Sequence, residues 1–418
     1  MRKRILGWVV LIAIVGVPGV TLSADEAKES EKKEPETLAE ALRKGEYGIN
    51  LRYRYEHVSD DAEKFDGRNG IASTLRTTID YRSLSFHGFG FKLQAENVTD
   101  IGHGDAHNNL GAGDLWNGVT DRPAIPDPEI TEFQQYALRY DGLRDTGFYA
   151  GRQELNLREQ RFVGAVGWRQ HHQTFDSFHV DTKALSRTHL TYAFLARQNT
   201  IFGSSQSMGS NVLMVDIDAG SPGTLTVYGI DLDYDEDAAS GLSTRTFGAR
   251  WKGSFDVGDN WKIPYHVELA DQSDTGKNPA NVDAGYLRLE VGGKCKLFWV
   301  KGGYELLEGS LDDGRFTTPL ATLHKWNGWA DKFLNTPATG LVDLFVAAGA
   351  KRGRTNGVLV YHDFSADSGG ADYGTELDLL VSWKAPWNQT FAAKAAFYSA
   401  DGFSADTDKF WLYTTYGF

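Results

Sequence analysis

Cysteine is almost absent from the sequence, which has 418 residues and contains only Cys295. A single cysteine cannot close an intrachain disulfide or build a cysteine-based zinc site. Long apolar runs are also missing beyond about Val20, which excludes a bundle of membrane-spanning helices for the rest of the chain. This absence leaves β-barrels open, because their strands carry apolar residues only at alternate positions.

Positive charge is in short supply as well. Lysine and arginine number 43 against 56 aspartates and glutamates, which gives a formal net charge of -13. A chain this acidic is a poor candidate for binding nucleic acid, and we expect no nucleic-acid partner.

The N-terminus has the pattern of a secretory signal. Basic residues open the chain, an apolar run extends from Ile5 to about Val20, and small residues end at Ala24. We therefore expect a signal peptide over residues 1–24. A membrane anchor is the alternative, but a Pro-Gly pair interrupts the apolar run.

The remaining chain divides into two predicted parts. Residues 25–46 are rich in charge and predict a periplasmic segment with one short helix in TLAEALRKG, where Thr37 is the expected cap and Glu40 follows three residues later. Across residues 47–418 the hydrophobic period changes to two, which is typical of β-strands.

Apolar and polar residues alternate repeatedly in this second part. In INLRYRYEH the leucine and tyrosines fall on one face, and the arginines and glutamate fall on the other. Similar segments include STLRTTIDYRS, FGFKLQAEN, YALRYD and TELDLLVSWK. About eighteen such segments can be counted, an even number of the kind found in bacterial outer-membrane barrels.

The connections also alternate in length. Short turns such as LRDT, KALS and AGSPG alternate with long polar segments at 59–70, 99–130, 155–172, 199–208, 271–283, 307–339, 366–372 and 400–407. The last segment, KFWLYTTYGF, is aromatic and alternating and ends at Phe418, which resembles the assembly signal of outer-membrane barrels. We predict an all-β fold, a transmembrane antiparallel β-barrel of 18 strands with short periplasmic turns and long extracellular loops, located in the outer membrane.

Histidines are the first candidates for a chemical site, but their pattern is weak. His171 and His172 are neighbours and would point apart in a strand, whereas His103 and His107 lie in a loop where no helix sets their spacing. No serine or cysteine nucleophile stands in a recognisable elbow. We predict no metal site, no cofactor and no enzymatic activity.

Arginine is the more informative residue, because its planar fork binds carboxylates at two points and many arginines occupy the polar strand face or the loops between strands. The predicted pore-lining residues are Arg52, Arg54, Arg76, Arg82, Arg139, Arg152, Arg161, Arg169, Arg197 and Arg250. A second interpretation stays open, in which the charges pair across strands and brace the wall. It rests on the acids assigned to the same faces, which are Glu56, Asp80, Glu96, Asp141, Asp231, Asp233, Glu268 and Glu290.

Several blocks of sequence resemble the alginate export family of Gram-negative outer-membrane barrels, over nearly the whole chain from Leu38 to Phe418. The most specific blocks are GRQELNLREQRFVGAVGWRQHHQTFD and TPLATLHKWNGWADKFL. The resemblance implies a monomeric porin of eighteen strands with an arginine-rich, anion-selective constriction shaped by inward-folded loops. Matched residue by residue, it implies roles for Arg52, Arg54, Arg152, Gln153, Arg161, Trp168 and Arg169.

The function predicted from these observations is passive, charge-selective passage of polar solutes, anionic sugars or an alginate-like polyuronate. The alternative is a plugged barrel whose extracellular loops bind a ligand or partner, with 307–339 the leading candidate for a plug. Expected partners are outer-membrane lipid and lipopolysaccharide, an anionic small molecule or polysaccharide, and the barrel-assembly machinery, which would bind the strand that ends at Phe418.

Overall fold

The computed structural model describes residues 34–418, and the predicted signal peptide lies outside this range. Helix α1 (Leu38–Arg43) precedes the sheet, and the hydroxyl of Thr37 accepts a hydrogen bond of 3.1 Å from the backbone N–H of Glu40. This confirms the predicted helix and its cap. Across residues 34–418, no helix has the length and apolar character needed to cross a membrane.

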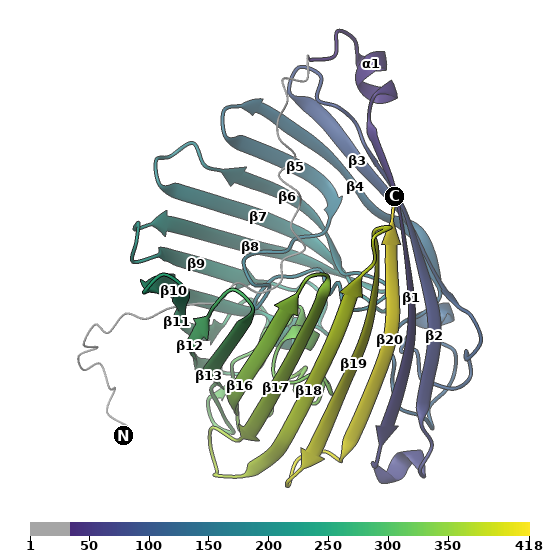
Figure 1. Ribbon diagram of the computed structural model, residues 1–418, viewed down its shortest axis with the longest axis vertical. Helices are drawn as coiled ribbons and strands as arrows, with labels where there is room; N and C mark the ends of the chain where they lie inside the picture. Colours follow the sequence, from purple (N-terminus) through teal and green to yellow (C-terminus); the bar gives the residue numbers. More distant parts are fainter. Residues whose placement is uncertain (1–33) are drawn as a thin grey trace.

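Eighteen strands form a single antiparallel sheet that closes on itself, because β1 pairs with both β2 and β20. The strands are β1 (Glu46–Asp60), β2 (Gly70–Arg82), β3 (Phe89–Asp100), β4 (Ile130–Leu143), β5 (Thr146–Gln153), β6 (Thr174–Thr182), β7 (Thr188–Asn199), β8 (Ser205–Asp218), β9 (Thr224–Leu232), β10 (Thr244–Val257), β11 (Trp261–Asp274), β12 (Asp283–Lys294), β13 (Phe298–Leu307), β16 (Leu341–Arg352), β17 (Thr355–Ser365), β18 (Asp372–Lys384), β19 (Gln389–Ala400) and β20 (Thr407–Gly417). The predicted barrel of 18 strands is confirmed (Figure 1).

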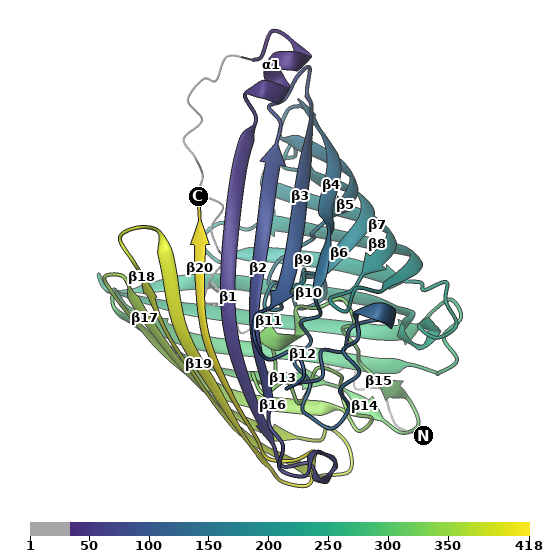
Figure 2. The same ribbon diagram turned by 90° about the vertical axis from the view of Figure 1, so that its right-hand side faces the viewer.

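Small elements lie in the connections. Strands β14 (Gly309–Ser310) and β15 (Gly314–Arg315) form a separate hairpin, and the 3-10 helices are η1 (Glu63–Phe65), η2 (Gly113–Leu115), η3 (Ser240–Leu242) and η4 (Leu323–Lys325). The end of the barrel near α1 has short turns, such as 144–145 and 353–354, and the opposite end has the long loops 101–129, 154–173 and 308–340 (Figure 2). We call the loop-bearing end extracellular, following the usual orientation of such barrels.

The outside of the barrel is apolar. Outward positions carry exposed side chains such as Leu138, Leu344 and Leu412. Because a closed sheet pairs the backbone groups of every strand, such a barrel can span a hydrocarbon layer, and the apolar exterior faces the lipid. The chain therefore has the fold and the exterior of an outer-membrane protein.

The lumen is not polar throughout. Phe162 and Val163 of loop 154–173 and Phe316 and Leu320 of loop 308–340 are buried within one apolar cluster inside the barrel. Inward-facing strand residues complete the cluster, among them Phe175, Leu195, Val212, Met214, Tyr228, Ile230, Leu232, Tyr286 and Leu307. One part of the barrel interior is thus a packed hydrophobic core built by loops and wall together.

This core corrects one assignment from the sequence. Alternation and charge place Asp231 on the inner face of its strand, but Ile230 and Leu232 are buried in the core and Asp231 pairs with the exposed Arg245. The alternation does not show which face of this strand is inward, because both faces hold apolar or charged residues. The inward face is determined by the loop that covers it.

Candidate functional site

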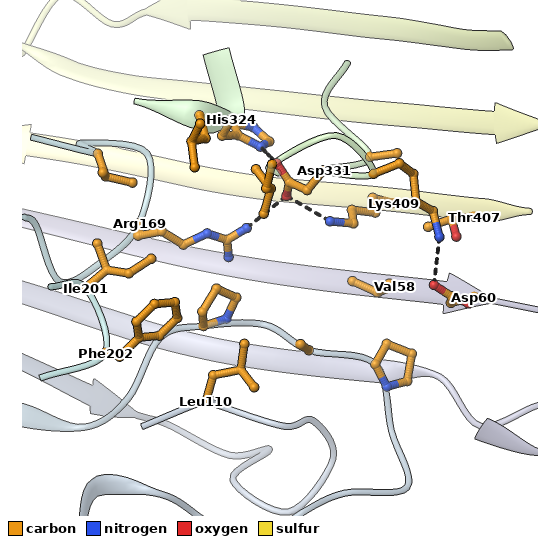
Figure 3. Close-up of a pocket in the computed structure, with 18 of the residues that line it drawn as sticks. Val58, Asp60, Leu110, Arg169, Ile201, Phe202, His324, Asp331, Thr407 and Lys409 are labelled. Carbon is orange, nitrogen blue, oxygen red and sulfur yellow. Dashed lines mark hydrogen bonds and ion pairs between the residues drawn. The ribbon is translucent and has the colours of Figure 1, made fainter. Parts of the chain in front are cut away.

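Two long loops that cross the lumen are joined at Arg169. Its guanidinium donates to Glu56 of β1 at 3.1 Å and to Asp331 of loop 308–340 at 3.3 Å. The Asp331 carboxylate also pairs with Lys409 of β20 at 2.8 Å and with His324 Nδ1 at 2.6 Å. Figure 3 shows Arg169, His324 and Lys409 converging on Asp331 from different elements. The arrangement fastens both loops to the barrel wall.

Arg54 extends the same network and is fully buried. It pairs with Asp127 of loop 101–129 and donates to the Trp168 carbonyl oxygen at 2.5 Å. Burial alone would raise the pKa of Asp127, but the positive charges of Arg54 and Arg169 outweigh it and lower that pKa to about 2. Asp127 is therefore ionised at neutral pH.

The charges in this network balance, and we call it the central brace. Its cations are Arg54, Arg169 and Lys409, and its anions are Glu56, Asp127 and Asp331. A buried network with matched charges holds its geometry and leaves no net charge to attract a solute. Two of the predicted pore-lining arginines, Arg54 and Arg169, therefore brace the loops.

Arg161 makes a second buried attachment. It pairs with Glu305 of β13 at 2.8 Å and donates to Thr318 and Asn327 at 3.2 Å each. Asn327 in turn donates to Glu305 at 2.7 Å. Loops 154–173 and 308–340 are thus bound to each other and to the same glutamate. Arg250 on β10 also attaches a loop to the barrel wall, since it pairs with Glu159 of loop 154–173.

Arg52 and Arg76 are different, and we call them the arginine pair. They are register partners on β1 and β2, both are buried, and both face the lumen. Arg52 donates to the Gly167 carbonyl oxygen at 2.9 Å, and Arg76 contacts His172 Nε2 and donates to Asn50 at 3.3 Å. Among residues 34–418, neither guanidinium forms an ion pair with a carboxylate.

Unused hydrogen-bond donors surround the arginine pair. Within the described part of the chain, Arg76 Nε and the indole N–H of Trp168 are buried without a hydrogen-bond partner. The guanidinium carbon of Arg52 lies 5.3 Å from the centre of the Trp168 ring. These two adjacent buried cations concentrate positive charge without a carboxylate of the described residues in direct contact, and Glu96 and Glu154 act on Arg76 only from beyond ion-pair distance.

His172 and His171 occupy the layer beside this pair. Arg76 can only donate, so His172 Nε2 accepts and His172 Nδ1 donates to Glu154 at 2.9 Å. His171 Nδ1 lies 2.9 Å from Glu96 of β3. The two side chains therefore have separate partners, and among residues 34–418 no group of three or more potential ligand side chains is placed to hold a metal ion.

A cavity lies on each side of this layer. The outer cavity, of about 430 Å³, opens among the extracellular loops and includes Arg169, Gln173 and Phe202 in its lining. The inner cavity, of about 540 Å³, faces the short-turn end and includes Arg82 and Glu154. Segment 170–173 therefore reaches both cavities, since Gln173 lines the outer one and His172 contacts Glu154 of the inner one.

The inner cavity collects further basic side chains from the wall. Arg82 and Arg139, two of the predicted residues, line it together with Lys92 and Arg158. Arg139 pairs with Asp141 at 3.3 Å, and Arg158 pairs with Asp216 at 2.9 Å. Arg82 and Arg139, from the predicted set of pore-lining arginines, therefore line the inner cavity.

The structure corrects the predicted placement of Arg152 and Arg197. Arg152 shares its side of β5 with the exposed Ala150, and its guanidinium carbon lies 5.3 Å from the ring centre of the exposed Tyr136. Arg197 follows a register shift between Leu195 and itself, which turns it to the side opposite the buried Leu195. Both arginines therefore face outward and pair with Asp176.

Sequence reasoning missed the lysines that complete the site. Lys394 of β19 is buried, contacts His324 Nε2 at 2.6 Å, and lies 3.7 Å from the ring centre of Trp329 and 4.2 Å from that of Trp168. Lys332 pairs with Asp60 at 2.9 Å near the outer cavity. The tryptophans in the two specific sequence blocks were the available signal, since aromatic faces are preferred partners of buried cations.

Comparisons with known proteins agree with this class of fold. No family model and no curated protein matches the sequence. The solved structures it resembles include OpdK of Pseudomonas aeruginosa with vanillate (TM-score 0.72, 14% identity, 90% of this chain and 99% of that chain covered) and OccK9 (OpdG) of the same organism, with the same values. OccAB3 of Acinetobacter baumannii is also similar, with a TM-score of 0.71, 12% identity, and 90% and 100% coverage.

OpdK is described as an outer-membrane protein, and at identities of 12 to 14% these structures establish the fold alone. The barrel architecture is thereby supported, and the outer-membrane location follows from the closed barrel and its apolar exterior. None of the comparisons links the chain to the alginate export family, so that resemblance stays a prediction.

Proposed function

We propose that the protein is an outer-membrane channel for small anionic solutes, and that the arginine pair is its filter. The single observation that carries the proposal is the side-by-side burial of Arg52 and Arg76 without a carboxylate partner. An entering anion supplies the missing counter-charge and can accept hydrogen bonds from donors that are already in place.

The route has three stages in this proposal. A solute enters the outer cavity, whose walls are mainly apolar and whose floor is the neutral central brace. It then displaces His172 from Arg76 and binds the arginine pair. It leaves through the inner cavity, where Arg82, Lys92 and Arg139 lower the cost of moving a negative charge.

The size of the cavities favours small solutes. Volumes of about 430 and 540 Å³ suit a sugar acid or an aromatic acid of the size of vanillate, the compound with which OpdK was crystallised. The apolar lining beside Phe202 and Leu110 suits a solute with one charged end and one apolar face. A polyuronate is a longer substrate whose charge has the same sign, and the experiment below includes a short oligomer of this kind.

Uptake by proteoliposomes tests the proposal. We expect labelled galacturonate to enter at least about threefold faster than galactose, which differs from it by the carboxylate. A short oligogalacturonate serves as the polymer probe. Equal uptake rates for the two monosaccharides would mean that the channel has no anion filter.

The second candidate is the plugged barrel, and the packed lumen is the observation that favours it. The apolar cluster and the central brace fasten loops 154–173 and 308–340 to the wall. In that case the outer cavity is a binding site on a closed surface. Proteoliposomes that admit neither monosaccharide would support the plugged barrel and overturn the channel.

A further inference from the structure

The outward arginines Arg152 and Arg197 lie at the extracellular boundary of the lipid-facing surface. They occupy outward positions close to the extracellular ends of β5, at Gln153, and of β7, at Asn199. Closer to the middle of the barrel, the same surface carries the exposed Phe178 and Phe194. We call the outward set Tyr136, Arg152, Asp176 and Arg197 the rim cluster.

The two arginines of the rim cluster share one carboxylate unequally. Arg152 donates to both oxygens of Asp176, at 2.8 and 3.4 Å. Arg197 reaches Asp176 only at 3.8 Å, and its side chain is 46% exposed. Its guanidinium forms no hydrogen bond with another residue in the range 34–418. Arg197 therefore presents free donors at the membrane boundary.

The acids near the rim cluster are few and already engaged. Asp176 also accepts a hydrogen bond of 3.2 Å from Asn199, and Glu132 lies 3.9 Å from Arg152 and 3.8 Å from His171. On other strands, outward positions at the extracellular end carry acids, including Asp363 of β17 and Asp408 of β20. Those positions repel an anionic lipid headgroup, which concentrates any attraction on β5 to β7.

We infer that the rim cluster binds the phosphate group of an outer-leaflet lipid, and specifically a glycolipid headgroup that bears phosphate monoesters. The guanidinium fork matches two phosphate oxygens, and Arg197 has the free donors to make that contact. Arg152 is held in place by Asp176 beside the Tyr136 ring and supplies a second positive charge. The site adjoins the apolar band, so the acyl chains of the same lipid lie against Phe178 and Phe194.

The experiment uses the folded full-length barrel in neutral detergent, with lipid A as the probe and its dephosphorylated form and phosphatidylcholine as comparisons. Retention is read by native mass spectrometry. We expect lipid A to be retained at least about tenfold better than the dephosphorylated lipid, and Arg197→Gln to reduce lipid A retention at least about fivefold. Arg152→Gln should reduce retention as well.

A matched control exists at the other end of the barrel. Arg187 forms a comparably weak ion pair of 3.9 Å with Asp218, and its side chain is 58% exposed at a periplasmic turn. Arg187→Gln should leave retention unchanged. Arg197→Lys, which keeps the charge without the fork, should give an intermediate loss. The shift of the folded barrel on an unheated gel checks that each variant is folded.

Three results would overturn the inference. These are equal retention by Arg197→Gln and Arg187→Gln, equal retention of lipid A and its dephosphorylated form, or full competition by millimolar inorganic phosphate. The last result would assign the site to a free anion instead of a lipid. The inference does not depend on transport, because the rim cluster faces away from the lumen.

Discussion

Individual arginines in this barrel have three different environments. Arg54, Arg161 and Arg169 pair with buried carboxylates, Arg152 and Arg197 face the membrane boundary, and the arginine pair has no carboxylate of residues 34–418 in direct contact. The residues that flank each arginine in the sequence do not distinguish these three environments. What separates them is the position of acids such as Asp127 and Asp331, which approach from loops distant in sequence.

The importance of one such acid can be tested by removing its charge. Asp127→Asn leaves Arg54 and Arg169 with less counter-charge in a buried site. We expect a loss of about 3 kcal/mol in the free energy of unfolding. Urea unfolding of the barrel in lipid vesicles measures it. Asp121→Asn, which breaks an exposed ion pair with Arg68, should cost less than about 1 kcal/mol.

The same carboxylate predicts a dependence on pH. The pKa of Asp127 is lowered from 3.8 to about 2, so its stabilising contribution is complete above about pH 4 and is lost as the pH falls toward 2. The stability difference between the wild type and Asp127→Asn should therefore shrink over that interval. Unfolding measured in matched vesicles at several pH values gives this difference, and a constant difference would contradict the assignment.

At the scale of elements, the segment from Leu323 to Leu334 is fixed at nearly every position. Its backbone N–H groups at Trp329 and Ala330 donate to Asp378 and Glu376 at 3.2 and 2.7 Å. Farther along the segment, Phe333 packs among aromatic rings of β17, β18 and the β19–β20 loop. A segment anchored by both backbone and side chains acts as part of the wall and not as a free loop.

Phe333 and its neighbour provide a direct test of that anchoring. Phe333→Ala should cost about 3 kcal/mol and release the loop, because the ring is buried against Phe364, Tyr373 and Phe403. Leu334→Ala, at a position 37% exposed beside the outer cavity, should cost under about 1 kcal/mol. Limited proteolysis of the folded barrel within 308–340 reports the release. Equal resistance of the two variants would show that the aromatic cluster does not hold the loop.

The elements themselves were largely predictable, because their signals are local. Strand alternation, the short and long connections and the Thr37 cap all lie within windows of about ten residues. Two features could not be predicted from windows of this length. The register shift before Arg197 reverses its direction, and Ile230 and Leu232 face inward because Phe162 and other loop residues cover them.

For the whole molecule, the interior has two regions of different character. The apolar cluster lies beside β6 to β10 and continues through Tyr286 of β12 to Tyr398 of β19 and Trp411 of β20, whereas the central brace lies beside β1 and β20. The passage that we propose runs from the outer cavity past the arginine pair to the inner cavity. The sequence indicated an arginine-rich lumen, but it could not show which arginines the loop acids neutralise.

The reversal potential of single channels in a planar bilayer, under a gradient of potassium chloride, tests the central claim most directly. The wild type should be anion-selective, and the double variant Arg52→Gln/Arg76→Gln should lower the ratio of chloride to potassium permeability at least about threefold. The control Arg144→Gln/Arg187→Gln removes two exposed charges from periplasmic turns and should keep the wild-type ratio. Cation selectivity in the wild type, or equal ratios for the two double variants, would contradict the proposal that the arginine pair filters anions.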